Sequence, residues 1–267
     1  MIGSILVKLK PLTEITCKSR GEECIYKLFL NVIEREDENL AEEIRNLKDE
    51  IPITLSPFLK GVKFSKGYTY LFPKDREYAT FRITYLKEEV LELILKGFGF
   101  LSEEKKAVEL GNGKVLIEKV DIQKAAHANF ISFKEILSNA KEENTIILEF
   151  CSPTFFEIKG KNKLFPLPEL VFPSLLKKWN KFSEVKIPWE IEKEFEKIEI
   201  EQYRLTTEPI NFSGNKIIGF IGKVNYRLPE SINKEVRKIL NALADFSFYS
   251  GVGSKNIIGM GQTRRTN

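Results

Sequence analysis

The sequence contains few of the residues that most often carry chemistry in enzymes. Its 267 residues include one histidine, His127, and three cysteines, Cys17, Cys24 and Cys151. The cysteines form no C-x-x-C pair and their number is odd, so they indicate neither a zinc site nor a disulfide framework. No zinc-protease, phosphate-binding-loop, serine-triad or paired-carboxylate motif is present. We therefore expect no metal and no cofactor.

Long apolar runs are also missing. No run approaches the roughly 20 apolar residues that span a bilayer, and Met1–Val7 lacks the basic lead and cleavage pattern of a signal peptide. We expect a cytoplasmic protein with no membrane partner. Hydrophobic residues make up 42% and charged residues 30% of the chain, which is typical of a globular protein with one large domain or two small ones.

Basic charge is concentrated at the carboxyl-terminal end. From Gly214 to Asn267 there are nine basic and three acidic residues, whereas Met1–Ser213 has 33 basic and 35 acidic ones. A lysine-rich, solvated surface would explain part of this excess. A basic patch also suits the phosphates of nucleic acids.

The order of predicted elements in the first half is β-α-β-β-α-β, the ferredoxin-like arrangement. Apolar residues alternate in the strands and recur at three- and four-residue spacing in the helices. The turn Gly111-Asn112-Gly113 indicates a hairpin. The predicted strands are Ile5–Leu9, Ile53–Phe58, Tyr68–Leu71, Thr80–Leu86, Val108–Leu110 and Val115–Ile117, and the helices are Gly21–Glu36, Leu40–Leu47 and Lys87–Lys96.

A similar pattern begins again after a predicted linker, Asp121–Phe130. Leu164–Pro173 contains three prolines and is predicted to be a turn, and Pro229 is predicted to open a helix. We therefore predict an α+β protein with two tandem ferredoxin-like domains, residues 1–122 and 131–267. The other second-half predictions are helices at Ser132–Asn139, Leu175–Phe182 and Trp189–Ile198 and strands at Thr145–Phe150, Glu199–Thr206 and Lys216–Tyr226.

Lys96-Gly97-Phe98-Gly99-Phe100-Leu101 is similar to the octamer whose aromatic residues stack on RNA bases in RNA-recognition motifs. That octamer occupies a central strand, but here the residues follow an amphipathic helix. We interpret Gly97 as a helix C-cap and the aromatic residues as core, rather than as a base-stacking surface.

The last stretch, Ser250–Gln262, contains four glycines in two G-x-G pairs that flank Lys255. Glycine permits positive φ and close approach of another backbone, and free N–H groups in such a turn can bind a phosphate oxygen. A helix cap followed by a turn into a last strand is the simpler interpretation. The double pair with a central lysine favours contact with a polyanion.

Several segments resemble the endoribonucleases that process CRISPR repeat RNA, within the repeat-associated mysterious protein superfamily. The most specific is Tyr249–Gly253 with Gly259-Met260-Gly261, which looks like the family's carboxyl-terminal glycine-rich loop. Phe150-Cys151-Ser152-Pro153-Thr154 is similar to its F-x-S-P-T strand. The further segments, which follow in the family's order, are Ile53–Gly61, Leu167-Pro168, Trp179–Phe182 and Gly219–Val224.

The resemblance implies cleavage without metal, by attack of an RNA 2′-hydroxyl on the adjacent phosphate. The family commonly places a histidine after the first helix, where this sequence has Arg45. Arginine stabilises charge but does not shuttle a proton. By resemblance, the candidate catalytic residues are Tyr26, Arg45 and Lys48, although each also fits an ordinary surface role. His127 does not match the family's position, and a structural role is favoured for it.

The leading functional hypothesis is binding and cleavage of CRISPR repeat RNA. Two alternatives are a repeat-RNA binder with little or no cleavage and a backbone subunit of an interference complex. Candidate partners besides RNA are an interference complex and a second copy of the chain. The candidate RNA-binding residues are Gly251, Gly253, Ser254, Lys255, Gly259, Gly261 and Arg264.

Overall fold

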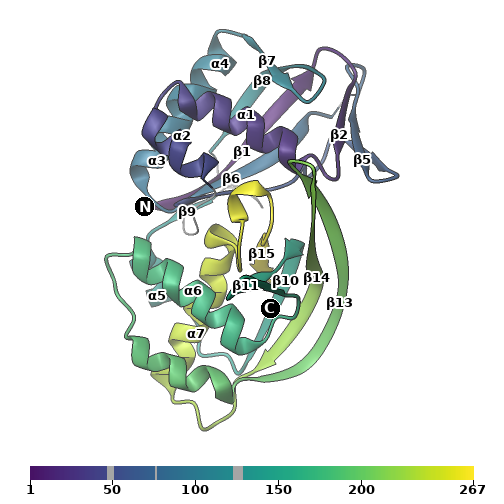
Figure 1. Cartoon of the computed structure of the whole chain (residues 1–267). Helices are drawn as coiled ribbons and strands as arrows, with labels where there is room; N and C mark the ends of the chain where they lie inside the picture. The colour runs from purple at the N-terminus through teal and green to yellow at the C-terminus, as the bar shows by residue number, and fades with distance from the viewer. Residues whose placement is uncertain (47–50, 76, 123–128) are drawn as a thin grey trace.

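Two antiparallel sheets, one from each half of the chain, form the framework of the computed structural model (Figure 1). The structure describes residues 1–46, 51–75, 77–122 and 129–267. The first sheet has the order β3-β6-β1-β8-β7. Its strands are β1 (Ile2–Pro11), β3 (Ile53–Leu55), β6 (Ala79–Tyr85), β7 (Ala107–Leu110) and β8 (Gly113–Asp121), with α1 (Glu22–Glu34) and α3 (Glu88–Ile94) between them in the chain.

The second sheet repeats this strand order. It runs β13-β14-β10-β15, so the first strand of each half lies between the third and the fourth. Both halves thus have the ferredoxin-like β-α-β-β-α-β order, and the predicted α+β fold class is confirmed. The elements are β10 (Thr145–Thr154), β13 (Glu199–Phe212), β14 (Asn215–Arg227), β15 (Thr263–Arg265), α6 (Pro168–Phe182) and α7 (Lys234–Ser250).

The two halves interlock. Strand β9 (Asn129–Ile131) pairs with β1, so residues near the start of the second half join the first sheet. The hairpin of β13 and β14 curves along one side and reaches the first half (Figure 1). Ile210 and Phe212 near its tip belong to the first hydrophobic core, whereas Ile2 belongs to the second. The predicted division into residues 1–122 and 131–267 stays a prediction.

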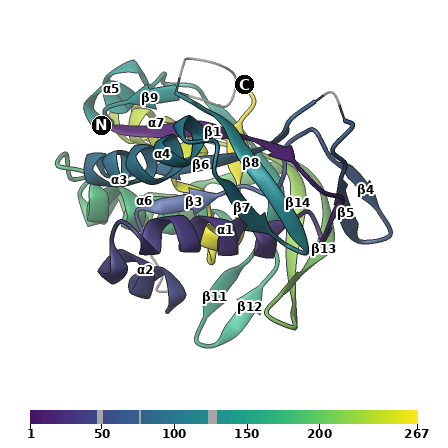
Figure 2. The same ribbon diagram turned by 90° about the horizontal axis from the view of Figure 1, so that it is seen from above.

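The remaining elements are short and lie outside the two main sheets. A three-stranded sheet projects at the opposite end of the molecule from α3 and α5 (Figure 2). Among the described residues, no helix is long and apolar enough to cross a membrane. The smaller elements are β2 (Ile15–Lys18), β4 (Lys63–Ser65), β5 (Tyr68–Leu71), β11 (Phe156–Ile158), β12 (Lys161–Lys163), α2 (Glu38–Arg45), α4 (Phe100–Glu103), α5 (Phe133–Asn139), the π-helix η1 (Leu95–Gly99) and the 3-10 helices η2 (Trp189–Lys197) and η3 (Asn256–Ile258).

Two proline-based predictions were wrong. Helix α6 begins at Pro168, where a missing N–H costs nothing, and continues through Pro173. Trp179 and its apolar neighbours on this helix are fully buried, and this packing outweighs the hydrogen bond that Pro173 cannot donate. Helix α7 begins at Lys234 rather than Pro229, because the Asn233 side chain caps it by accepting the Val236 N–H at 2.9 Å.

Gly97 is not a helix C-cap, since the helix continues through η1 into α4. A Cβ at Gly97 would lie 2.6 Å from the Val32 side chain, so glycine lets this helix pack closely on α1. Phe98 is fully buried, as the core interpretation predicted, whereas Phe100 is about half exposed.

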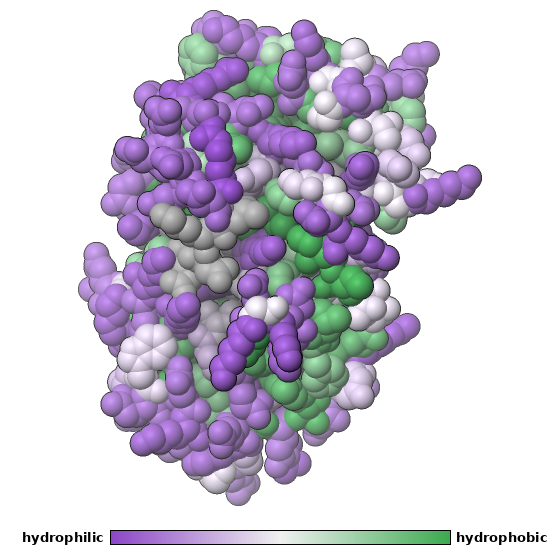
Figure 3. Space-filling model, in the orientation of Figure 1, coloured by the Kyte–Doolittle hydropathy of each residue, from purple (hydrophilic) through white to green (hydrophobic). Residues whose placement is uncertain are grey.

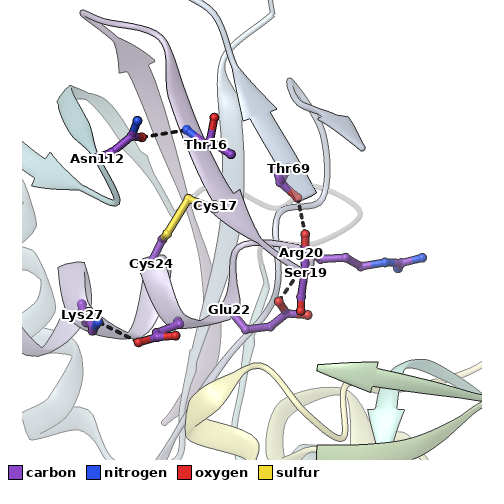
Figure 4. The surroundings of a disulfide bond; sticks show 10 residues. Thr16, Cys17, Ser19, Arg20, Glu22, Cys24, Lys27, Thr69 and Asn112 are labelled. Carbon is purple, nitrogen blue, oxygen red and sulfur yellow. Dashed lines mark hydrogen bonds and ion pairs between the residues drawn. A yellow bond between two sulfur atoms is a disulfide. The ribbon is translucent and has the colours of Figure 1, made fainter. Parts of the chain in front are cut away.

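The cysteine pattern in the sequence indicated no disulfide framework, but the structure contains one disulfide. A disulfide joins Cys17 of β2 to Cys24 of α1 (Figure 4). A tight turn between β2 and α1 brings the two residues together, and spacing in the sequence does not reveal such a turn. Cys151 remains a free, exposed cysteine.

Candidate functional site

The glycine-rich segment, Gly251–Gly261, leaves the end of α7 and turns back toward β15. Its four glycines and Lys255 all have positive φ, between 59° and 85°. A Cβ at Gly253 would collide with the Phe155 carbonyl oxygen, and one at Gly261 would collide with the Val252 carbonyl oxygen. Glycine is therefore required here by the chain's own backbone.

The same segment docks on the first half of the chain. Ile257, Ile258 and Met260 are buried in the first core, where η3 packs against α1 and β3. A Cβ at Gly259 would lie 2.8 Å from Cγ of Glu22 at the start of α1. The part of the segment that reaches solvent is Gly253–Asn256. RNA contact by Gly251, Gly253, Gly259 and Gly261 stays a prediction.

Lys178 of α6 forms hydrogen bonds to the glycine-rich segment. Its buried ammonium donates to the carbonyl oxygens of Ser250, Gly251 and Gly253, each at 3.2 Å, and to the Asn256 side chain. A lysine ammonium has three N–H donors and no acceptor, so carbonyl oxygens are suitable partners for it. The interactions fix the curvature of the turn that presents Ser254 and Lys255.

Glu22 lies beneath Gly259 and is 2% exposed. One carboxylate oxygen accepts the Arg20 N–H at 2.8 Å, whereas Oε1 has no partner among the described residues. Burial raises the pKa of Glu22 to about 7, against hydrogen bonds from the backbone that lower it. Figure 4 shows Glu22 between the turn before α1 and the yellow ribbon of the glycine-rich segment.

A second buried contact joins the halves at β15. The Arg82 guanidinium of β6 donates to Gln262 and lies over the Phe248 ring, 4.3 Å from its centroid. Gln262 in turn donates to the Thr54 hydroxyl and the Leu55 carbonyl, both at 3.0 Å. Burial lowers the pKa of Arg82 to about 10, so it remains charged at neutral pH. These bonds fix the end of the glycine-rich segment relative to β3 and β6.

Tyr26 and Arg45 lie together at the edge of α1 and α2. Tyr26 is 8% exposed, and its hydroxyl donates to the Ile44 carbonyl at 3.3 Å. Burial raises its pKa, which nearby Arg45 lowers in part. The Arg45 side chain is 39% exposed and forms an ion pair with Glu34 at the end of α1. Tyr26 is thus not a surface residue, and Arg45 is not an isolated charge.

Two of the predicted residues cannot be placed. Lys48 and His127 lie outside the described residues.

A cavity of about 230 Å³ opens beside the glycine-rich segment. Gly253, Ser254 and Lys255 form one wall, and Ile53 of β3 belongs to another. Its remaining lining comes mainly from β11 and from the exposed side of α6, including Lys177. The N–H of Gly253 donates to the Ser174 hydroxyl at 2.9 Å, which fixes the loop at the cavity rim. The cavity therefore presents lysine side chains, the glutamates Glu157 and Glu169, and a backbone turn between the two halves.

Arg264 is not brought to this cavity. It lies on β15, where its guanidinium pairs with Glu149 at 2.7 Å, and it lines a different hollow with Asp245 and Tyr249. The structure thus brings Ser254 and Lys255 together and leaves Arg264 apart from them.

Comparison with known proteins was made for the sequence and for the fold. A family model described as CRISPR-associated endoribonuclease Cas6 matches residues 148–263. A curated Cas6 endoribonuclease from Streptococcus thermophilus is 29% identical over 153 residues, which cover 55% of this chain and 60% of that protein. A Mycobacterium tuberculosis Cas6 endoribonuclease is 28% identical over 134 residues, covering 49% of this chain and 42% of its own length. The matched regions thus span less than two thirds of both relatives.

The fold comparison extends over the whole chain. A Cas6 product complex has a TM-score of 0.81 with 22% identity, covering 100% of both chains. Thermus thermophilus Cas6 has a TM-score of 0.74, covering 100% of this chain and 98% of its own. The sequence of the second half is thus similar to that of Cas6 endoribonucleases, and the whole chain has the fold of these Cas6 structures.

The match to the Cas6 family model is uneven across the candidate site. Residues 148–263 include the glycine-rich segment and Lys178, but neither Tyr26 nor Arg45. The part of the site that is most like Cas6 in sequence is therefore the part that the second half supplies.

Sequence reasoning missed three residues of this region. Glu22 and Glu34 are glutamates on an amphipathic helix, where they are normally solvated, and no sequence signal marks them as buried or ion-paired. Lys178 lies in Lys177-Lys178-Trp179, and only its place on the apolar face of α6 could have indicated burial.

Proposed function

We propose that this chain binds CRISPR repeat RNA and cleaves the precursor transcript within the repeats. The observation that carries the proposal is the docking of the glycine-rich segment on α1. It places a cavity lined by three lysines and two glutamates at the junction of the halves, while the same segment contacts α1, the helix that carries Tyr26.

The names of the similar proteins support this proposal. The curated relatives are named CRISPR-associated endoribonucleases. Solved structures of the same fold include Cas6 product and substrate-mimic complexes and a RAMP protein binding different RNA substrates. These structures match the fold of this chain over at least 99% of its length.

Phosphate binding is assigned to the turn Gly253–Lys255. Lys255 has positive φ, and both Lys255 and Lys177 line the cavity. Among the described residues no acceptor is found for the Lys255 N–H, which leaves a backbone donor beside a cationic side chain. Such a pair suits an RNA phosphate oxygen. The loop glycines form this turn, and contact between their backbone and RNA is part of the proposal.

Cleavage is assigned to the edge of α1 and α2, by attack of the RNA 2′-hydroxyl on the neighbouring phosphate without a metal. This step forms a cyclic phosphate and releases a 5′-hydroxyl. Arg45 would stabilise the charge that develops on the phosphate, and Lys48 is a second candidate cation. Tyr26 stays protonated at neutral pH because burial raises its pKa, so it can donate a hydrogen bond but not accept a proton. We therefore expect slow cleavage.

One observation favours a second function, a repeat-RNA binder with little or no cleavage. The Tyr26 hydroxyl is already bonded to the Ile44 carbonyl, and Arg45 is already paired with Glu34. RNA would have to replace the Tyr26 interaction and would compete with Glu34 for the Arg45 guanidinium.

The test is incubation of the purified protein with end-labelled repeat RNA in a chelator. The proposal predicts one slow cut within the repeat, with cyclic-phosphate and 5′-hydroxyl ends. Tight, repeat-selective binding without a cut would favour the second function. Affinity no higher than for a scrambled RNA would contradict both.

We further propose that the protein acts in the cytoplasm, where a precursor transcript is made. An interference complex and a second copy of the chain remain proposed additional partners.

A further inference from the structure

The three-stranded sheet β2-β5-β4 carries a row of aromatic side chains on one face. Thr69 and Leu71 of β5 are buried, so Tyr68, Tyr70 and Phe72 point to the opposite, outer face. Tyr68 is 41% exposed. The rings of Tyr68 and Tyr70, and of Tyr70 and Phe72, are 6.5 Å apart between centroids. Tyr70 and Phe72 are half-buried. Single exposed aromatic residues are common, but a row of three on one face of a small sheet is not.

Lysines flank this row on both neighbouring strands. Lys18 of β2 pairs with Tyr68 and Lys63 of β4 pairs with Tyr70, so both belong to the outer face. The Lys63 ammonium lies 4.9 Å from the centroid of the Phe72 ring. Among the described residues neither lysine forms an ion pair. From Lys60 to Asp75 there are four lysines and one acidic residue. In Figure 3, hydrophilic purple and pale side chains mix at the upper right, where β2 and β5 lie in Figure 1.

The sheet is fixed to the start of α1. The Thr69 hydroxyl donates to the Ser19 carbonyl at 2.8 Å, and the Ser19 N–H donates to the Gly67 carbonyl at 2.8 Å. The Cys17–Cys24 disulfide joins β2 to α1 (Figure 4). Three residues after Ser19, Glu22 packs against Gly259 of the glycine-rich segment. A strand of RNA that leaves the site at this end of α1 would therefore reach the sheet within a few nucleotides.

We propose that the outer face of β2-β5-β4 is an accessory platform for single-stranded RNA. The bases of an extension that flanks the bound repeat stack on Tyr68, Tyr70 and Phe72, while Lys18 and Lys63 contact its phosphates. Aromatic stripes bordered by lysines suit single strands of any sequence, because every base has a face that can stack. That the RNA is an extension of the repeat depends on the proposed function. That this face binds single-stranded RNA does not depend on it.

The experiment compares two RNAs, the repeat alone and the repeat with a flanking single strand of about ten nucleotides, within the usual site size of such platforms. Stacking of one base changes affinity by about fivefold or more. The wild-type protein should therefore bind the extended RNA at least about fivefold more tightly than the trimmed RNA. The Tyr68→Ala/Tyr70→Ala double variant should lose this preference and bind trimmed RNA within about twofold of the wild type.

Phe100→Ala is the matched control. Phe100 is 49% exposed, and the Lys106 ammonium lies 4.6 Å from its ring centroid, but it has no aromatic neighbour on a sheet face. The control should bind both RNAs as the wild type does. Should the double variant unfold, cross-linking of wild-type protein to 5-iodouridine in the extension supplies the second measurement, with adducts expected at Tyr68, Tyr70 or Phe72.

Equal wild-type affinity for the two RNAs, or cross-links confined to other residues, would overturn the proposal. A double variant that no longer self-associates but binds both RNAs as the wild type does would also overturn the proposal, because the face would then be a protein interface. A ten-uridine oligomer separates this proposal from the proposed function. Binding of the oligomer that depends on Tyr68 and Tyr70, without selectivity for repeat RNA, would support the platform while contradicting repeat recognition.

Discussion

The two parts of the candidate site differ in how strongly the fold determines them. Both ends of the glycine-rich segment are buried, Val252 in the second core and Ile257, Ile258 and Met260 in the first, and the segment is bonded to Lys178. The edge of α1 and α2 holds Arg45 through one ion pair with a half-exposed glutamate, Glu34. Exposed ion pairs contribute little to stability. The glycine-rich segment can therefore position a ligand, whereas Arg45 can exchange Glu34 for a ligand when one binds.

The largest expected effect tests whether the glycines are required by the chain itself. Gly261→Ala should lower stability by about 3 kcal/mol more than Gly214→Ala, because only Gly261 faces another backbone group. Both positions have positive φ, 70° and 79°, so the control carries the same conformational cost. Urea denaturation of both variants measures the difference. Equal losses would show that close packing at Gly261 is unimportant.

Lys178→Met should have the next largest effect. It removes the ammonium donor from the carbonyl oxygens of Ser250, Gly251 and Gly253, of which only Gly251 keeps another donor, the Ser250 hydroxyl, and should cost about 3 kcal/mol. Affinity for repeat RNA should fall as well, because Ser254 and Lys255 lose their fixed position. Lys177→Met, an exposed change on the same helix, is the control for stability. A Lys178→Met variant as stable as this control would contradict the assigned role.

Glu22→Gln tests the contact between the segment and α1 through pH. The folded pKa of Glu22, about 7, exceeds its ordinary value of 4.5, so the native state binds the additional proton. Stability should therefore fall as pH rises from about 4.5 to about 7, by on the order of 3 kcal/mol in full. The glutamine variant lacks this loss, and its stability relative to the wild type should rise between pH 5 and pH 8.

Thermal unfolding at the two pH values measures this change. Glu23→Gln is the control, since the Glu23 carboxylate reaches solvent and pairs with Lys27 at 2.6 Å. A stability difference between Glu22→Gln and the wild type that is the same at both pH values would contradict burial of the Glu22 charge.

A smaller effect distinguishes Lys255 from Arg264, which the sequence analysis predicted to bind RNA together. Each phosphate-bound cation contributes about 0.7 to the log–log salt slope on single-stranded RNA. Lys255→Ala should make the slope shallower by about this amount, whereas Arg264→Ala should change it little because Arg264 pairs with Glu149 away from the cavity. Fluorescence titration between 50 and 200 mM salt, roughly the range over which such slopes are measured, gives both values. A larger change for Arg264→Ala would place the RNA path along β15.

Sequence reasoning succeeded where a local pattern has one physical cause. Apolar alternation and β-branched residues predicted most strands of both sheets, though not β9 and β15, and the paired glycines indicated a turn with positive φ. It was wrong where tertiary packing overrides local preference. The burial of Trp179 keeps Pro173 inside α6, and close packing of the helix on Val32 explains why a glycine occupies position 97.

The chemistry of the site could be predicted only in part. Tyr26 and Arg45 do lie together, as the family resemblance implied. Their partners, Ile44 and Glu34, depend on how α2 folds back on α1, and the burial of Glu22 depends on a segment more than 200 residues away in the chain. No local pattern encodes such contacts. The assignment of these residues to catalysis stays a prediction.

The most direct test of the central claim is the single-turnover rate of repeat-RNA cleavage, measured in a chelator with wild-type, Arg45→Ala and His127→Ala proteins. If the edge of α1 and α2 is the cleaving site, Arg45→Ala should slow the cut by roughly tenfold or more while RNA affinity changes little. His127→Ala should cleave at the wild-type rate. A normal rate in Arg45→Ala together with a large loss in His127→Ala would contradict the account.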